Sequence, residues 1–235
     1  MVPAFGEEQR IATTVETLRA ALSTVAAAGG LELIVVDDGS ADDTAGRADA
    51  AGADQVIRLP VNRGKGAAVR AGVLAAQGST IVFTDADLSY PPAQVARVLD
   101  EVERGWDMVV GSRHHIDTRT LVRSGRVREI SGRAFNLVTR MLIRQPFGDT
   151  QCGLKGFFRN AARELFGRGF VDGFAFDVEL LVIASELGYL VTEVPVELAS
   201  AEGSTVRVSV EALHMLRDLV RIRRWSSSGR YRAAE

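Results

Sequence analysis

The chain has 235 residues, a net charge of −2 at pH 7, 46% hydrophobic residues and 25% charged residues. This composition is typical of a soluble α/β protein with a substantial core, and the charge argues against a nucleic-acid binder. The single cysteine excludes an internal disulfide framework, no apolar run approaches the roughly 20 residues that span a bilayer, and the acidic start is no secretory signal. We therefore expect a cytoplasmic protein, peripheral at the inner face of a membrane if it contacts one.

The first 113 residues are predicted to alternate between strands and helices. Short apolar runs predict strands at residues 1–5, 31–36, 55–59, 81–84 and 108–113. Apolar side chains at helical spacing predict helices at residues 7–28, 44–51, 66–77 and 95–104. Such alternation is typical of an α/β fold with a mostly parallel sheet flanked by helices.

The second half of the chain has a less regular pattern. Residues 114–130 lack periodicity, which predicts either a functional loop or disorder. Further elements are predicted as helices at 131–144 and 177–187, strand-like structure at 147–158 and a strand at 191–198. We expect one domain over residues 1–207, a basic amphipathic helix at 208–225 and a disordered tail at 226–235.

A pair of carboxylates follows the strand predicted at residues 81–84. Asp85 and Asp87 come directly after it, and Pro91-Pro92 closes the segment. Right-handed crossovers would bring them to the same sheet edge as the acids at residues 7, 8, 37 and 38 and as Lys65. Neighbouring carboxylates repel each other unless a cation lies between them, and a hard divalent ion suits them. The alternative is a solvated, aspartate-rich turn.

Two other strand ends carry polar groups. Asp37 and Asp38 precede Gly39, where a carboxylate can accept hydrogen bonds from a sugar or a base; the alternative is an Asx turn. Residues 62–66, Asn-Arg-Gly-Lys-Gly, precede a helix, and such a turn can bind an anion, although the motif alone is a weak signal.

Together these segments resemble the polyprenyl-phosphate (dolichyl-phosphate) hexosyltransferases among the inverting glycosyltransferases of the GT-A fold. The resemblance covers roughly residues 1–210, and within the group it is greatest to the dolichyl-phosphate β-glucosyltransferase type, which uses UDP-glucose. It rests on eight motifs in order: VPAFGEE (2–8), VVDDGSADDT (35–44), NRGKGAAV (62–69), TDADLSYPP (84–92), GSR (111–113), DTQCGLKGF (149–157), FAFDVELL (174–181) and EVPV (193–196).

The resemblance implies roles for individual residues. The expected nucleotide-binding residues are Pro3, Phe5, Glu7, Asp37, Asp38, Lys65, Gly66, Asp85 and Ala86. Asp85 and Asp87 would hold Mg²⁺ or Mn²⁺ against the donor diphosphate, and Arg113 would face the phosphates. Gly6 departs from the family, which usually has asparagine there.

The expected chemistry follows from charge. The leaving group is a nucleoside diphosphate, whose growing charge the metal neutralises. The attacking lipid phosphate is already anionic, so the protein mainly has to bring two anions together. The candidates for binding the acceptor are Arg119, Arg123, Arg126, Arg128 and Arg133, unless they form a solvated basic loop. The expected catalytic set is Asp149 with Asp87 and Arg113; Asp177 and Glu179 are alternatives to Asp149, unless they cap a helix.

The alternatives concern the donor, the class of protein and the partners. A mannosyltransferase that uses GDP-mannose is the first alternative, and a sugar transferase with a different acceptor is the second. A sugar-nucleotide pyrophosphorylase is disfavoured because residues 4–8 are acidic, and a scaffold is disfavoured by the intact aspartate pair. The basic, apolar segments 135–143 and 209–225 are expected to dock onto a membrane; the alternatives for the second are core packing or a homodimer contact.

Overall fold

A computed structural model describes residues 1–120, 139, 147–198 and 208–232. Strands β1 (Val2–Ala4), β2 (Ile34–Asp37) and β3 (Gln55–Arg58) form a parallel sheet in the order β1-β2-β3. Strands β4 (Thr80–Thr84), β7 (Leu154–Phe158), β5 (Met108–Ser112) and β8 (Val191–Pro195) form a second sheet in the order β4-β7-β5-β8. β7 is antiparallel to both of its neighbours, whereas β8 is parallel to β5.

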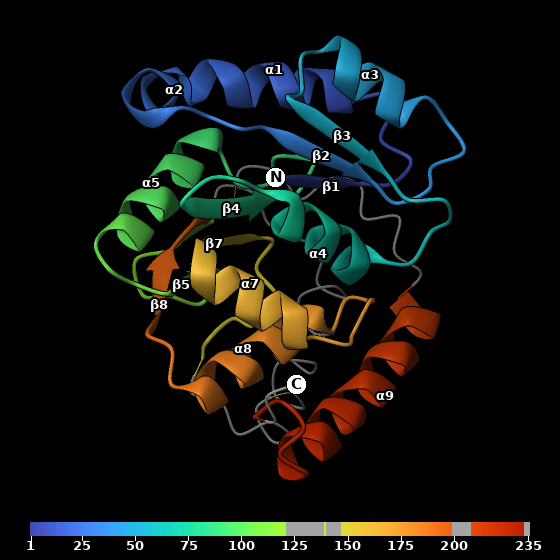
Figure 1. Cartoon of the computed structure of the whole chain (residues 1–235), viewed down its shortest axis with the longest axis vertical. Helices are drawn as coiled ribbons and strands as arrows, with labels where there is room; N and C mark the ends of the chain where they lie inside the picture. Colours follow the sequence, from blue (N-terminus) through green and yellow to red (C-terminus); the bar gives the residue numbers. More distant parts are fainter. Residues whose placement is uncertain (121–138, 140–146, 199–207, 233–235) are drawn as a thin grey trace.

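The two sheets meet where β1 lies beside β4 (Figure 1). The amide of Thr84 donates a hydrogen bond of 3.2 Å to the carbonyl oxygen of Met1. Because β1, β2 and β4 run into the same region, the residues that follow them gather at one edge, as the sequence predicts.

Helices cover both faces of the sheets. They are α1 (Ile11–Ala21), α2 (Ser23–Gly29), α3 (Thr44–Ala50), α4 (Lys65–Ala75), α5 (Pro92–Glu103), α7 (Arg159–Arg168), α8 (Phe176–Leu187) and α9 (Val208–Ser227). Successive strand residues point to opposite faces, so Val36 packs with residues of α4, α7 and α8, and Val35 packs with residues of α1 and α5. The strands are therefore buried on both sides.

The elements differ from the prediction in three places. The helix predicted at 7–28 is two helices that meet at Leu22, and α2 has no buried side chain to hold it in line with α1. The strand predicted at 191–198 divides into β8 and β9 (Glu197–Leu198), and β9 pairs with β6 (Arg119–Thr120). α7 was not predicted. The helix predicted at 131–144 lies, apart from residue 139, outside the described residues.

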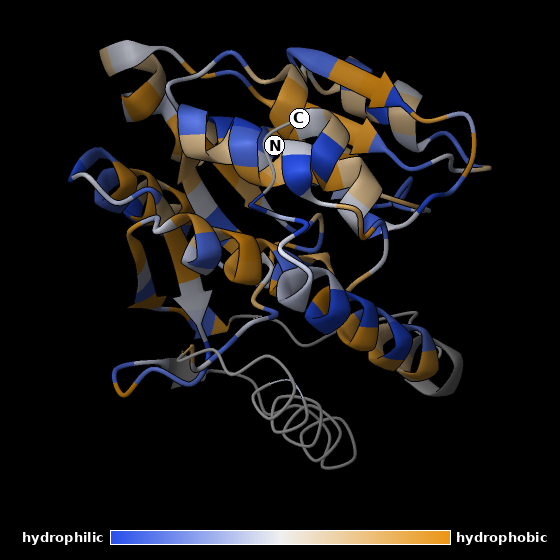
Figure 2. Ribbon diagram, turned by 60° about the horizontal axis from the view of Figure 1, so that its bottom comes forward, coloured by the Kyte–Doolittle hydropathy of each residue, from blue (hydrophilic) through white to orange (hydrophobic). Residues whose placement is uncertain are grey.

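The C-terminal helix α9 is amphipathic, with polar and apolar residues along its length (Figure 2). Leu219 and Ile222 are buried, whereas Leu213, Leu216 and Val220 are exposed. In the part of the chain that the structure describes, every helix is too short or too polar to cross a bilayer.

The predicted disorder after residue 225 is wrong for residues 226–232. Tyr231 is completely buried, and its ring packs with those of Phe170 and Trp225 at centroid distances of 6.2 and 6.4 Å. Burying an aromatic ring offsets the entropy of ordering this polar, glycine-containing segment. Residues 233–235 lie outside the described part.

Candidate active site

The aspartates after β4 lie against two other segments. Asp85 Oδ1 is 2.5 Å from Lys65 Nζ, at the start of α4. A Cβ atom added to Gly153 would be 1.9 Å from Asp85 Oδ2, so any larger residue there would displace this carboxylate. Asp87 accepts hydrogen bonds from the amide and the hydroxyl of Ser89 at 2.9 and 2.7 Å. Residues from α4, β4 and the 149–153 segment thus converge on one point.

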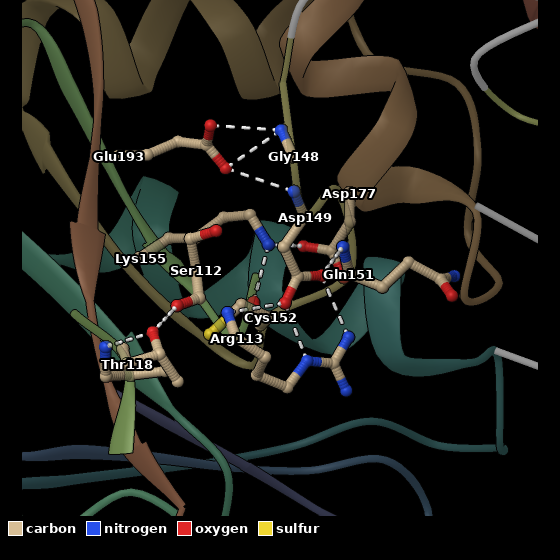
Figure 3. Close-up of polar contacts among 11 residues, drawn as sticks. Ser112, Arg113, Thr118, Gly148, Asp149, Gln151, Cys152, Lys155, Asp177 and Glu193 are labelled. Carbon is tan, nitrogen blue, oxygen red and sulfur yellow. Dashed lines mark hydrogen bonds and ion pairs between the residues drawn. The ribbon is translucent and has the colours of Figure 1, made fainter. Parts of the chain in front are cut away.

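Beneath this point is a buried ion pair that sequence reasoning missed. Lys155 Nζ is 2.6 Å from Asp177 Oδ1 and donates a second hydrogen bond to the carbonyl oxygen of Cys152 (Figure 3). Burial raises the pKa of Asp177, although the charges of Lys155 and Lys65 partly oppose it. Burial lowers the pKa of Lys65, but the charges of Asp85 and Asp177 outweigh it and the pKa is raised. Acids and bases therefore alternate through this part of the site.

Arg113 and Asp149 form a second pair (Figure 3). The guanidinium donates to both carboxylate oxygens, with Nε–Oδ2 at 2.6 Å and Nη2–Oδ1 at 2.8 Å, and the Arg113 amide adds a third bond at 3.0 Å. Burial raises the pKa of Asp149, but the hydrogen bonds and charge of Arg113 more than offset it, leaving a pKa of about 2. Asp149 is thus a weak base, and its two carboxylate oxygens fix the orientation of the Arg113 guanidinium.

A carboxylate on β8 holds the segment that carries Asp149. Glu193 Oε1 accepts hydrogen bonds from the amides of Gly148 and Asp149 at 3.1 and 3.0 Å. The EVPV motif contains Glu193, so the sequence drew attention to this segment without giving the residue a role. The structure gives it the role of holding the Asp149 loop (Figure 3).

Asp37 and Asp38 are both buried and bound to the chain itself. Asp37 Oδ1 accepts from the amide of Ser40 at 2.9 Å, and Oδ2 lies 3.5 Å from Arg58 Nε. Asp38 accepts from the amides of Arg63 and Gly64 at 2.9 and 2.8 Å, and burial raises its pKa. These carboxylates thus shape the turns beside the site.

The other predicted nucleotide-binding residues differ in exposure. Pro3 is buried in β1, whereas Phe5 is 55% exposed just beyond the strand. Burial raises the pKa of Glu7; Arg10 opposes this rise, and the charges of Asp87 and Asp85 add to it, which places Glu7 near the aspartate pair. The Ala86 carbonyl oxygen accepts a hydrogen bond from the Thr14 hydroxyl at 2.6 Å.

Gly66 has a packing role that the sequence did not indicate. A Cβ atom at this position would be 2.7 Å from the Val171 carbonyl oxygen and from the Phe176 Cβ atom. α4 therefore needs glycine here to approach the 171–176 segment.

Several candidates are not brought into an open site. Glu179, the second alternative to Asp149, accepts hydrogen bonds from Val171 and Tyr231 rather than facing the aspartates. Cys152 is buried, and burial raises its pKa to about 11, as befits a packed side chain. For Arg119 the structure gives only the backbone, in β6. Arg123, Arg126, Arg128 and Arg133 lie outside the described residues.

The donor set at Asp85 and Asp87 fits a hard divalent cation. Among the residues that the structure describes, no three His, Cys, Asp or Glu side chains come together as a group that could hold a metal ion. Two carboxylates suit Mg²⁺, which usually takes its other ligands from substrate phosphates and water.

Comparison with known proteins decides the family. Residues 1–166 match the family model described as glycosyl transferase family 2. The chain belongs to this family. This family 2 glycosyltransferase is 36% identical to the dolichyl-phosphate β-glucosyltransferase of Drosophila melanogaster, over 94% of this chain and 73% of the relative. It is 32% identical to the human enzyme of the same name, over 99% of this chain and 76% of the relative.

Solved structures support the same fold. Glucosyl-3-phosphoglycerate synthase of Mycobacterium tuberculosis, in complex with UDP, matches with a TM-score of 0.70 and 25% identity, over 94% of this chain and 78% of that one. A structure of that enzyme with Mn²⁺ and UDP-glucose, at 24% identity and a TM-score of 0.65, shows a shared fold; it covers 100% of this chain and 79% of that one. The predicted GT-A fold is confirmed, and the protein is a glycosyltransferase.

Proposed function

We propose that this glycosyltransferase transfers glucose from UDP-glucose to a polyprenyl phosphate of the dolichyl type, with inversion at the sugar. The observation that carries the proposal is the convergence of Asp85, Asp87 and Lys65 at one sheet edge. The relatives named dolichyl-phosphate β-glucosyltransferase support glucose and the lipid phosphate. The UDP-bound structural neighbour supports the uridine nucleotide.

Asp85 and Asp87 would hold Mg²⁺ or Mn²⁺. When bound, the ion neutralises the charge that grows on the departing diphosphate. Lys65 adds a positive charge beside the same phosphates, and Arg113 adds another, fixed in direction by its bidentate contact with Asp149. Asp149 is therefore proposed to position Arg113 rather than to remove a proton.

The attacking group needs little activation because a phosphate monoester is already anionic at pH 7. No strong base is required, which agrees with the low pKa of Asp149. Phe5, exposed beyond β1, and Glu7 are proposed to contact the base and ribose. Asp37 and Asp38 act indirectly, by shaping the turns, and Arg63–Gly66 form the turn nearest the nucleotide.

The acceptor is proposed to reach the site from a membrane surface. The arginines at 119, 123, 126, 128 and 133 are proposed to bind its phosphate. α9 offers a docking face, because exposed Leu213, Leu216 and Val220 lie alongside exposed Arg217, Arg221 and Arg224. Such a basic, apolar helix is typical of proteins that bind the interface of anionic lipids. The protein is proposed to act at the cytoplasmic face of that membrane.

A transfer assay with radiolabelled donors tests the proposal. Purified protein is incubated with either UDP-glucose or GDP-mannose and with either short-chain polyprenyl phosphate or 3-phosphoglycerate as the acceptor, in Mn²⁺ or in EDTA. We expect label in the lipid only with UDP-glucose and metal. Faster transfer from GDP-mannose would show that the donor is GDP-mannose and not UDP-glucose. Transfer to 3-phosphoglycerate but not to lipid would show that the acceptor is not a polyprenyl phosphate.

A further inference from the structure

The C-terminal segment ends in a buried hydrogen bond to a carboxylate on α8. The Tyr231 hydroxyl donates to Glu179 Oε1 at 2.8 Å, and Tyr231 has no exposed surface. The Arg168 guanidinium holds the same residue through its carbonyl oxygen at 2.8 Å. Residues 226–232 are thus attached to the body of the protein at a specific point, 52 positions from Glu179 in the sequence.

The same carboxylate holds the segment between α7 and α8. Glu179 Oε2 accepts hydrogen bonds from the amides of Phe170 and Val171 at 3.0 and 2.8 Å. Glu179 is almost completely buried, so these donors replace water for its charge. One side chain therefore joins the C-terminal segment to residues 169–173.

Residues 169–173 in turn pack on the turn that leads to Lys65. The Asp172 carbonyl oxygen accepts from the Ala67 amide at 3.1 Å, and its carboxylate pairs with Arg63 at 2.9 Å and with Arg70 at 2.5 Å. A Cβ atom on Gly64, whose φ is +107°, would be 2.6 Å from the Asp172 carbonyl oxygen. The backbones of the two segments therefore lie in direct contact at Gly64 and Asp172.

That turn carries groups that the proposed function assigns to the donor site. The Arg63 and Gly64 amides bind Asp38, and Lys65, the next residue, binds Asp85. A continuous series of contacts therefore runs from Tyr231 through Glu179 and Asp172 to Lys65. Tyr231 and Glu179, the first members of this series, do not face the aspartate pair. We therefore assign them no direct contact with substrate.

We propose that Tyr231 and Glu179 are positioning residues for the nucleotide: they hold residues 169–173, and these hold the 62–67 turn in the conformation that binds the donor diphosphate. The proposal deepens the proposed function and rests on it for the identity of the ligand. It predicts an effect on affinity for the donor that exceeds any effect on the acceptor.

The test compares two hydroxyl deletions. Tyr231→Phe removes the bond to Glu179 but keeps the aromatic ring that packs with Phe170 and Trp225. Ser226→Ala removes a hydroxyl bond from the same part of the chain to Glu186, which is also on α8. Each protein is studied without ligand by hydrogen–deuterium exchange, and then with UDP and Mn²⁺ by calorimetry.

We expect Tyr231→Phe to raise amide exchange in residues 62–67 at least about 3-fold and to weaken UDP binding about 3- to 10-fold. Ser226→Ala is expected to leave both unchanged. In the transfer assay Tyr231→Phe should raise KM for the donor with little change in KM for the acceptor. Asp172→Asn, which acts at the other end of the series, should speed exchange in 62–67 but not in 226–232.

Three results would overturn the proposal. One is faster exchange in Tyr231→Phe that stays within residues 226–232 and 169–171. Another is an equal loss of UDP affinity in Tyr231→Phe and Ser226→Ala, which would indicate general loosening. The third is unchanged exchange in residues 62–67 for Asp172→Asn. If wild-type protein binds no UDP, the proposed function fails, whereas exchange in the ligand-free protein still decides the coupling.

Discussion

Lys65 and Asp85 form an ion pair at 2.5 Å, so the lysine ammonium lies beside a carboxylate that we propose as a ligand of the divalent ion. The pair is mostly shielded from water, with side-chain exposures of 18% for Lys65 and 30% for Asp85. Charge at this point is thus balanced before substrate arrives. A bound diphosphate with its divalent ion would supply a counter-charge to Lys65 and to Asp85, so the pair could open without leaving either charge unbalanced.

Replacing Lys65 should affect metal and nucleotide in opposite directions. In Lys65→Met, Mn²⁺ alone should bind about 10-fold more tightly because the competing ammonium is gone, and UDP should bind about 10-fold less tightly because a phosphate contact is lost. Electron paramagnetic resonance of free Mn²⁺ and calorimetry with UDP measure the two effects. Arg104→Met, which replaces an exposed arginine just after α5, is the control. A fall in both affinities would contradict the shared role of Asp85.

The pair of Arg113 and Asp149 predicts a component of acid sensitivity. The pKa of Asp149 is about 2 in the folded protein, below its ordinary value of 3.8, so the folded state binds this proton less readily than the unfolded state. The pair therefore stabilises the protein by roughly 2 kcal/mol above pH 4, and this contribution disappears as the pH falls through 2.

Urea unfolding of wild type and Asp149→Asn between pH 7 and pH 2 checks this sign. The free energy of unfolding should differ most at neutral pH, and the two curves should converge in acid. A constant difference across the whole range would show that the ionised form of Asp149 contributes nothing.

Lys155 and Asp177 should behave as a coupled pair. Either charge alone would be buried without its direct ion-pair partner, so Lys155→Met and Asp177→Leu should each lower the free energy of unfolding by about 3–5 kcal/mol. The double variant should lose much less than the sum. Urea unfolding in a double-mutant cycle measures the coupling, and additive losses would mean that the buried contact at 2.6 Å carries no specific energy.

The apolar face of α9 should support binding to lipid. Leu213→Ser with Leu216→Ser should weaken binding to vesicles that contain anionic lipid by at least about 10-fold, because two leucines no longer enter the interface. The control is Leu190→Ser, which removes a similarly exposed leucine, 58% accessible, away from α9. Sedimentation with vesicles at low and high salt is the measurement. Equal binding of the two variants to vesicles would exclude this face of α9 as the surface that binds lipid.

The α/β pattern of the first 113 residues was predictable because each strand and helix follows its own periodicity. The edge that gathers Asp85, Lys65 and Glu7 followed from that pattern, since strand ends of a parallel sheet meet. The break at Leu22 was not predictable from apolar spacing, which continues through residue 25. The sequence does contain a signal for helix α7. Ala162, Leu165 and Phe166 recur at helical spacing, which would have identified the helix.

The missed side chains share one property: their partners are distant in sequence. Lys155 stands out as a charge within an apolar strand, which indicates a buried partner, but spacing alone does not point to Asp177. Asp149 was expected to be a catalytic residue, and its bond to Arg113 depends on β5 and the 149–153 segment being neighbours. Tyr231 lies in a polar segment whose composition favours disorder, and its packing with Phe170 and Trp225 and its hydrogen bond to Glu179 explain its order.

The most direct test of the account is the dependence of UDP binding on a divalent cation, measured by calorimetry in wild type and in Asp85→Asn. Asp100→Asn, an exposed aspartate on α5, is the matched control. In wild type and in the control, Mn²⁺ should tighten UDP binding at least about 10-fold, whereas in Asp85→Asn it should have no effect. UDP that binds wild type equally well with Mn²⁺ and with EDTA would contradict the central claim.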